Sequence, residues 1–293
     1  MSIDSTWLRC PNCFLDISEV DTDVFGCTAG HRFDRAKHGY LTLLPPKAPR
    51  TIGDDREMLQ ARAALLDGGA YAPIAAAITA AVNAHRSRSS DDALHVADFG
   101  CGTGYYSAAL AHAIPASTFL LADRSPEAVR TSLRTLPSAT GVVMDLWRPL
   151  PLRDSVVDVA LNVFAPRNAA EFARVLRPHG RLIVVVPTDA HLQELRNSGA
   201  LLDVPAGKSD RVAEQLREAG LVLRTNTAVE YVFEADAATR GLLADMGPSA
   251  HHGDSLASSD PTVAEVEAFD VSVSVSVLTF EHAAPVAPSS VPY

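Results

Sequence analysis

Apolar and polar residues alternate along this chain with two periods, and their order predicts an α/β fold. Residues Glu57–Leu66 and Tyr71–His85 repeat apolar side chains with the helical period, and the polar stretch Arg86–Asp92 separates them from a first strand around Val96. Beyond that point short apolar runs alternate with helical segments, which is typical of a Rossmann-like, doubly wound sheet. The further predicted strands are Thr118–Ala122, Gly141–Asp145, Ser155–Val163, Arg181–Val186, Leu221–Tyr231 and Phe269–Phe280, and the further helices are Ala169–Leu176 and Ser209–Ala219.

The segment VADFGCGTGY, residues 96–105, joins a predicted strand to an Ala-rich helix through a glycine-rich turn. Asp98 ends the strand, and Asp123 ends the next strand about 20 residues beyond the loop, where an acid can accept hydrogen bonds from ribose hydroxyls. A loop of this kind lets the backbone approach a ligand more closely than a Cβ would permit. Its glycines are Gly100, Gly102 and Gly104.

The spacing GxGxG, with no following lysine, disfavours both a dinucleotide and a nucleoside triphosphate. S-adenosylmethionine fits better, because Asp145 ends the third predicted strand where it can lie near an adenine edge. The sequence therefore predicts an S-adenosylmethionine-dependent methyltransferase fold. The alternative is an α/β domain whose glycines serve only as turns.

Three of the four cysteines lie near the N-terminus at the spacing of metal ligands. CxxC is followed by thirteen residues and then CxxxH, and three thiolates with one imidazole make a closed tetrahedral zinc site. The predicted ligands of this single zinc are Cys10, Cys13, Cys27 and His31. Buried free cysteines or a disulfide are the alternatives. A disulfide is disfavoured because no signal peptide precedes the cysteines. Cys101, inside the glycine loop, is interpreted as a packing residue.

Charge and hydropathy indicate whether the protein binds a membrane or a nucleic acid. No apolar run approaches the ~18 residues of a membrane span and no export signal is present, so a cytoplasmic protein without membrane attachment is expected. A net charge of −10 opposes nucleic-acid binding, but a basic stretch with interleaved aromatic residues follows the cysteines. It predicts an RNA-facing patch, for which a solvated loop is the alternative. The basic residues are Arg32, Arg35, Lys37, Lys47 and Arg50.

The 293 residues divide into two modules, because a proline cluster follows the cysteine-rich segment. We expect a zinc ribbon over residues 1–48, a linker with helices over 49–92, and a methyltransferase domain over 93–285. Residues 286–293 extend a Pro-, Ala- and Ser-rich end that is expected to be mobile.

Several motifs together resemble one family over nearly the whole chain. The cysteine ribbon is followed by HRFDRAKHGYLTLL, MLQARAALLDGGAYAPI, DFGCGTGYY, LNVFAPRN and finally MGPS. This series is similar to the 23S rRNA guanine-N1 methyltransferases of the RlmA type, and most to their actinomycete macrolide-resistance branch. The resemblance implies an RNA-recognising zinc ribbon, S-adenosylmethionine as methyl donor, and a homodimer. It implies a target in the hairpin 35 loop of 23S rRNA, guanosine 748 by similarity.

The family's site residues carry over one by one. Its zinc ligands fall on the four residues named above. Its cofactor contacts fall on Gly102 and Thr103 in the loop, Tyr71 in GGAYAPI, and His191 after the fifth strand. A packing aromatic and a surface helix cap are the alternatives for Tyr71 and His191. One departure is that the acid of the second strand is followed here by RSP, where relatives have a serine and a lysine.

The chemistry of guanine N1 limits the catalytic candidates. N1 carries a proton at neutral pH, which must be removed or polarised as the methyl group arrives. Asn162 and Arg167, after the fourth strand, are placed by topology to hydrogen-bond the base edge and to stabilise charge on O6 or hold a phosphate. Two other functions stay open: a small-molecule, antibiotic-pathway methyltransferase, and a non-catalytic zinc-ribbon RNA-binding protein.

Overall fold

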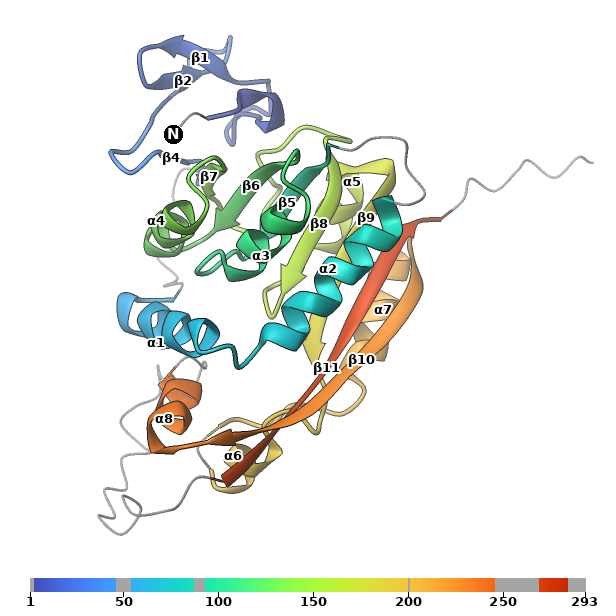
Figure 1. The fold of residues 1–293 in the computed structure, drawn as a ribbon. Coiled ribbons are helices and arrows are strands. Elements are labelled where there is room, and N and C mark those ends of the chain that lie inside the picture. Colours follow the sequence, from blue (N-terminus) through green and yellow to red (C-terminus); the bar gives the residue numbers. More distant parts are fainter. Residues whose placement is uncertain (1–2, 46–53, 87–92, 200, 246–268, 284–293) are drawn as a thin grey trace, which may run out of the picture.

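A computed structural model describes residues 3–45, 54–86, 93–199, 201–245 and 269–283 of the chain. Lys47, Arg50, the MGPS motif and the predicted C-terminal tail lie outside these residues. A three-stranded sheet near the N-terminus accompanies a larger eight-stranded sheet (Figure 1). Among the described residues no single helix is long and apolar enough to cross a membrane. Helices α1 (Arg56–Asp67) and α2 (Ala72–Arg86), bent by 79° to each other, are together long and apolar enough by length and composition only.

The large sheet has the order β10-β11-β9-β8-β5-β6-β7-β4. From β4 to β9 neighbouring strands run parallel, whereas β11 is antiparallel to both β9 and β10. The strand order reverses between β5 and β8, and ligands of such sheets bind at this point beyond the carboxyl ends of the strands. The strands are β4 (Tyr40–Thr42), β5 (His95–Phe99), β6 (Thr118–Asp123), β7 (Thr140–Val143), β8 (Val157–Val163), β9 (Leu176–Pro187), β10 (Leu221–Ala235) and β11 (Phe269–His282).

Helices cover both faces of this sheet and bury a separate apolar core on each (Figure 1). Alternate strand residues divide between the cores, so that Val96 packs under one set of helices and Ala97 under the other. Helices α1 (Arg56–Asp67), α2 (Ala72–Arg86), α3 (Tyr105–Ala113) and α4 (Pro126–Thr135) contribute to the first core, and α5 (Ala169–Val175) and α7 (Lys208–Glu218) to the second. The short helices α6 (Gln193–Asn197) and α8 (Ala237–Asp245) lie near the end of β10 and the start of β11 (Figure 1).

The N-terminal module shares a core with the large sheet. It comprises a short 3-10 helix η1 (Ser5–Trp7) and strands β1 (Ser18–Asp21), β2 (Val24–Gly26) and β3 (Arg32–Asp34). Trp7, Leu8 and Ile17 are buried in the same cluster as Phe99 of β5 and Phe172 of α5. Strand β4, within the residues expected in the ribbon, pairs in parallel with β7 and forms the edge of the large sheet.

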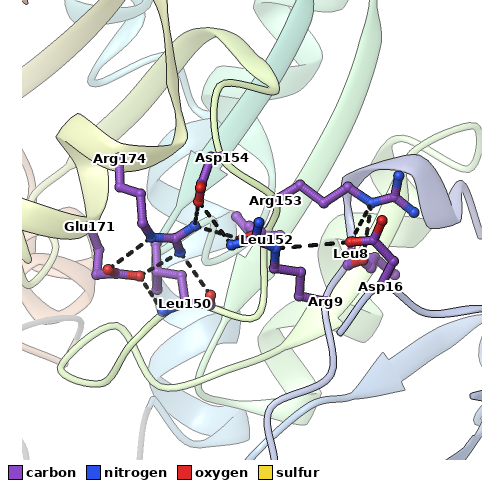
Figure 2. Close-up of polar contacts among 9 residues, drawn as sticks. All are labelled: Leu8, Arg9, Asp16, Leu150, Leu152, Arg153, Asp154, Glu171 and Arg174. Atoms are coloured by element: carbon purple, nitrogen blue, oxygen red, sulfur yellow. Dashed lines mark hydrogen bonds and ion pairs between the residues drawn. The ribbon is translucent and has the colours of Figure 1, made fainter. Parts of the chain in front are cut away.

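A polar network also joins the N-terminal module to the loop before β8 and to α5 (Figure 2). Arg174 on α5 donates to Asp154 at 2.6 Å, and Arg9 of the N-terminal module donates to the same carboxylate at 2.9 Å. Arg9 and Arg153 both pair with Asp16, at 3.9 and 3.4 Å. The hydrogen bond from Arg174 holds the pKa of Asp154 below its ordinary value. The loop before β8 therefore joins the N-terminal module to the sheet through shared acids.

The predicted strands and helices are present with shifts at their ends. Strand β9 begins at Leu176, five residues before the predicted start, because Leu176 already pairs with Val157 of β8. The pattern did not reveal β4, α4, α6 or α8. Helix α4 does have a recognisable start: Ser125 caps it by accepting from the Ala128 N–H, and Pro126 occupies its first turn.

Candidate active site and zinc centre

The four predicted zinc ligands converge on one point. Their ligand atoms all lie within 4.8 Å of one another. Cys13 Sγ is 3.6 Å from Cys27 Sγ, and His31 Nδ1 is 3.4 to 3.5 Å from the three sulfurs. The edges of a tetrahedron with Zn–S and Zn–N bonds of standard length are roughly 3.8 Å for S···S and roughly 3.6 Å for S···N. The cluster therefore fits one zinc ion, held by Cys10, Cys13, Cys27 and His31.

The glycine loop is fastened between β6 and the turn that follows β8. The Gly100 and Cys101 N–H groups both donate to the Ala122 carbonyl, at 2.8 and 3.0 Å. Gly100 has φ +91°, and a Cβ there would lie 2.4 Å from Ala165 Cβ. Only glycine permits this contact, so the loop and the turn carrying LNVFAPRN lie directly against each other.

Gly102, Thr103 and Gly104 continue the loop into α3. Gly102 has φ +50°, and a Cβ added there would meet only the Arg62 guanidinium, at 3.5 Å. Thr103 is buried, and Gly104, at φ +79°, is the N-cap of α3. The space over the left-handed Gly102 is suited to close approach by a ligand, whereas a Cβ on Gly104 would lie 2.9 Å from Ser132, so α3 and α4 pack closely there.

Two acids stand beside this loop, the buried Asp98 and the partly buried Asp123. Asp98 lies in β5 and accepts a hydrogen bond from Ser107 Oγ at 2.6 Å. Burial, with repulsion from Asp123, raises the pKa of Asp98 to about 7. Asp123 accepts from the Gly102 N–H at 3.1 Å and the Ser125 N–H at 2.9 Å, and burial likewise raises its pKa. Two neighbouring carboxylates, one buried and one partly exposed, suit a ligand that brings positive charge and hydroxyl donors, as S-adenosylmethionine does.

Asp145 is buried and lies two residues beyond the end of β7, because the strand stops at Val143 and not at Asp145 as predicted. Its Oδ1 accepts from the Trp147 N–H at 3.0 Å, and its Oδ2 pairs with Arg124. Arg124 is the first residue of the RSP departure noted in the sequence. The departure thus adds a cation beside the carboxylate expected at the adenine edge, and a contact of Asp145 with the cofactor stays a prediction.

Tyr71 and His191, distant in sequence, are brought together on the other side of the loop. Tyr71 lies between α1 and α2, His191 follows β9, and the Tyr71 hydroxyl is 3.4 Å from His191 Nε2. The Ser274 N–H donates to His191 Nδ1 at 3.3 Å, and burial lowers the pKa of His191 to about 4. The imidazole is therefore neutral and carries its proton on Nε2, which donates to the Tyr71 hydroxyl.

Phe164 completes this group of rings, and sequence reasoning missed it. Its centroid lies 6.1 Å from that of Tyr71 and 6.0 Å from that of His191. Tyr71 and His191 are buried, whereas Phe164 is 40% exposed. A sequence signal existed, because Phe164 lies in the LNVFAPRN motif that supplied Asn162 and Arg167.

Asn162, near the end of β8, and Arg167, in the turn after it, lie on either side of Phe164 in the sequence. Asn162 is fully buried, and its Nδ2 donates to the carbonyls of Phe99 and Pro166 at 3.0 and 2.8 Å. Its Oδ1 and the Nε of Arg167 are buried without a hydrogen-bond partner among the described residues. Burial lowers the pKa of Arg167, and the neighbouring Lys208 ammonium is likewise destabilised by burial and by Arg167.

The predicted RNA-facing patch is only partly described. Arg32 is exposed and donates to the carbonyls of Cys27 and His31, and Lys37 is exposed. Arg35 pairs with Asp23 of the same module. The patch therefore has fewer uncommitted cations than its sequence suggests, and its binding of RNA stays a prediction.

Known proteins match both modules. A methyltransferase-domain family model matches residues 96–180, and a model of the N-terminal zinc ribbon of RlmA matches residues 8–51. A 23S rRNA (guanine(748)-N(1))-methyltransferase of Streptomyces fradiae is 39% identical over 85% of this chain and 87% of its own length. A Micromonospora griseorubida protein, provisionally named a 23S rRNA (guanine-N(1)-)-methyltransferase, is 44% identical over 71% of this chain and 75% of its own.

The sheet, the glycine loop and the metal cluster define an S-adenosylmethionine-dependent methyltransferase with an N-terminal zinc ribbon. The named relatives narrow this class of methyltransferase to one family. A similarly named Bacillus subtilis protein, YxjB, is 32% identical over 67% of this chain and 69% of its own. The chain belongs to the family of 23S rRNA (guanine-N1)-methyltransferases.

We expect cofactor binding at about pH 6.5 to release a proton. Asp98, whose pKa is about 7, is largely protonated there in the free protein, and a cationic ligand favours its carboxylate. Affinity for S-adenosylmethionine should therefore rise as the pH increases through about 7 and level off above it. Calorimetry in two buffers of different ionisation enthalpy measures the released proton. Asp98→Asn should remove the buffer dependence, and a buffer-independent enthalpy in the unmodified protein would contradict the prediction.

Proposed function

We propose that this protein transfers the methyl group of S-adenosylmethionine to N1 of a guanosine in the hairpin 35 loop of 23S rRNA. The observation that carries the proposal is the 39% identity, over nearly the whole chain, to the Streptomyces fradiae guanine(748) enzyme. Guanosine 748 is the proposed position and macrolide resistance the proposed benefit. We place the reaction in the cytoplasm, where ribosomal RNA is available, and propose a homodimer on the family resemblance alone.

The contacts of this chain support the cofactor part of the proposal. The bound cofactor supplies an electrophilic methyl group, and the protein has to orient it. Asp123 is positioned for the ribose, while Gly102 and Thr103 line the turn along which the ligand would lie. Tyr71 and His191, neutral and hydrogen-bonded to each other, form a buried wall on the far side. The glycine loop follows β5, Asp123 ends β6 and His191 follows β9, so these residues come from the carboxyl side of parallel strands around the β5–β8 reversal, where sheets of this kind bind ligands.

Proposed roles at the acceptor base rest on two buried atoms. Asn162 Oδ1 is an acceptor and Arg167 Nε a donor, and each is buried without a partner among the described residues. An unsatisfied buried polar atom costs about 1–3 kcal/mol, which a ligand can recover. We propose that Asn162 accepts from the guanine edge and that Arg167 stabilises negative charge on O6. In-line alignment of N1 with the methyl group would supply most of the acceleration.

The RNA part of the proposal has a physical requirement. N1 lies on the Watson–Crick edge, so pairing hides it and the enzyme must act on a loop base or displace one. A hairpin-loop guanosine meets that requirement. We propose that the zinc ribbon contacts the RNA backbone through Arg32, Arg35 and Lys37, together with Lys47 and Arg50.

The proposal predicts methylation of one nucleotide. A hairpin 35 transcript incubated with the protein and radiolabelled cofactor should accept about one methyl group, and reverse transcription should stop beside the modified guanosine because N1 methylation blocks pairing. A transcript with that guanosine replaced by adenosine is the matched control. Label in the control transcript, or an arrest at another base, would contradict the position. Labelling of small metabolites but not RNA would favour the alternative of a small-molecule methyltransferase.

A further inference from the structure

Phe164 has an unusual backbone for its residue type. It follows β8 directly and has φ +54°, in the left-handed region that a bulky side chain adopts only at a cost of roughly 1–3 kcal/mol. Its large apolar ring is also 40% exposed. This exposure reduces the burial energy that could offset the cost, so contacts of the surrounding turn have to hold the conformation.

Three contacts impose it. The Phe164 N–H donates to the Val185 carbonyl of β9 at 3.2 Å. Asn162 closes the turn from inside by donating to the carbonyls of Pro166 and Phe99. Ala165 packs on Gly100 so closely that no Cβ fits between them. The turn is therefore fixed against the glycine loop, and the ring of Phe164 is fixed with it.

The ring of Phe164 is the exposed edge of the proposed cofactor wall. Its near-parallel neighbour His191, at an interplanar angle of 19°, and Tyr71 are both buried behind it. Phe164 is thus the exposed member of a cluster whose other two rings form the proposed cofactor wall. It belongs to the turn after β8, at the point where the sheet order reverses.

We propose that Phe164 is the platform on which the target guanine stacks while N1 faces the methyl group. This inference rests on the proposed function and adds the residue that orients the base. A displaced base loses its neighbours in the RNA, and stacking on an aromatic face is worth about 1–3 kcal/mol. A rigid platform also restricts the base to one plane, which serves in-line transfer. These gains explain why an exposed phenylalanine is held in a costly conformation.

The test compares Phe164→Leu with Phe164→Tyr in the full-length protein. Leucine keeps an apolar side chain but removes the aromatic face, and tyrosine restores that face. At saturating enzyme, Phe164→Leu should slow single-turnover methylation of the hairpin 35 transcript between about fivefold and 150-fold, the equivalent of the ~1–3 kcal/mol stack. Phe164→Tyr should stay within about twofold of the unmodified rate. Affinity for S-adenosylhomocysteine should be the same in all three proteins.

A spectroscopic measurement separates stacking from a general loss of activity. The same transcript carrying 2-aminopurine at the target position should show quenched fluorescence when bound to the unmodified protein or Phe164→Tyr. Bound to Phe164→Leu it should be brighter, because the displaced base lacks an aromatic neighbour. Unchanged methylation by Phe164→Leu, or a fall in S-adenosylhomocysteine affinity that matches the fall in rate, would overturn the platform. If the unmodified protein transferred no methyl group to the transcript, the proposed function would fail first.

Discussion

Replacing Asp123 by alanine should abolish measurable binding of S-adenosylmethionine. The carboxylate ends β6, is oriented by the N–H groups of Gly102 and Ser125, and is expected to accept from both ribose hydroxyls. A hydrogen bond to a charged group is worth about 1.5–3 kcal/mol, so loss of two should weaken binding at least a hundredfold. Titration calorimetry at pH 8, where Asp98 is ionised in the free protein, measures the change without the coupled proton.

The matched control is Asp158→Ala. Like Asp123, Asp158 is a strand acid that accepts from a backbone N–H: it lies in β8 and accepts from the His95 N–H at 2.9 Å and from the Arg177 guanidinium at 2.7 Å. It lies near the start of β8, away from the carboxyl ends. Its loss should lower the melting temperature but leave the cofactor affinity unchanged. Equal affinity in Asp123→Ala and the unmodified protein, with both folded by circular dichroism, would remove Asp123 from the site.

The fold class was predictable because its evidence is local. Runs such as Arg181–Val186 and the alternation of Val and Ser from Phe269 onward predict strands from neighbouring residues alone. They do not predict burial, because Ser274 and Ser276 are buried where β11 lies between β9 and β10. Strand β4 was not predictable in the same way. It has three residues, and its conformation is stabilised by pairing with β7, about 100 residues later in the chain.

The same distinction applies to the site. The zinc ligands follow from their spacing, because a CxxC turn fixes its two sulfurs by local geometry. The pairing of Tyr71 with His191 joins the α1–α2 turn to the segment after β9, and no periodicity reports that contact. Resemblance to the family supplied both residues, but it did not supply Phe164. The left-handed conformation of Phe164 depends on Asn162, Ala165 and β9, so it became visible only in three dimensions.

Losing the zinc ion should destabilise the whole protein, not only the ribbon. The unmodified protein should contain one zinc per chain, and Cys13→Ala should contain almost none. Structural zinc contributes an apparent ~10–16 kcal/mol to folding in small modules. Here Trp7 and Leu8 share a core with Phe99 of β5 and Phe172 of α5, and β4 forms the edge of the large sheet. Unfolding of the ribbon would expose this face, so the melting temperature of the methyltransferase domain should fall by several degrees.

Cofactor affinity separates this expectation from general misfolding. The glycine loop and Asp123 are tied to each other and to the segment just before α1 through contacts that do not involve the ribbon, such as Ser125 Oγ donating to the Asp54 carbonyl at 2.8 Å. S-adenosylmethionine should therefore still bind to Cys13→Ala below its melting temperature, while methylation of the transcript should fall to background. Cys101→Ala is the control, because its thiol lies in the glycine loop and the variant should retain zinc. A zinc-free protein with an unchanged melting temperature would show that the ribbon and the sheet fold independently.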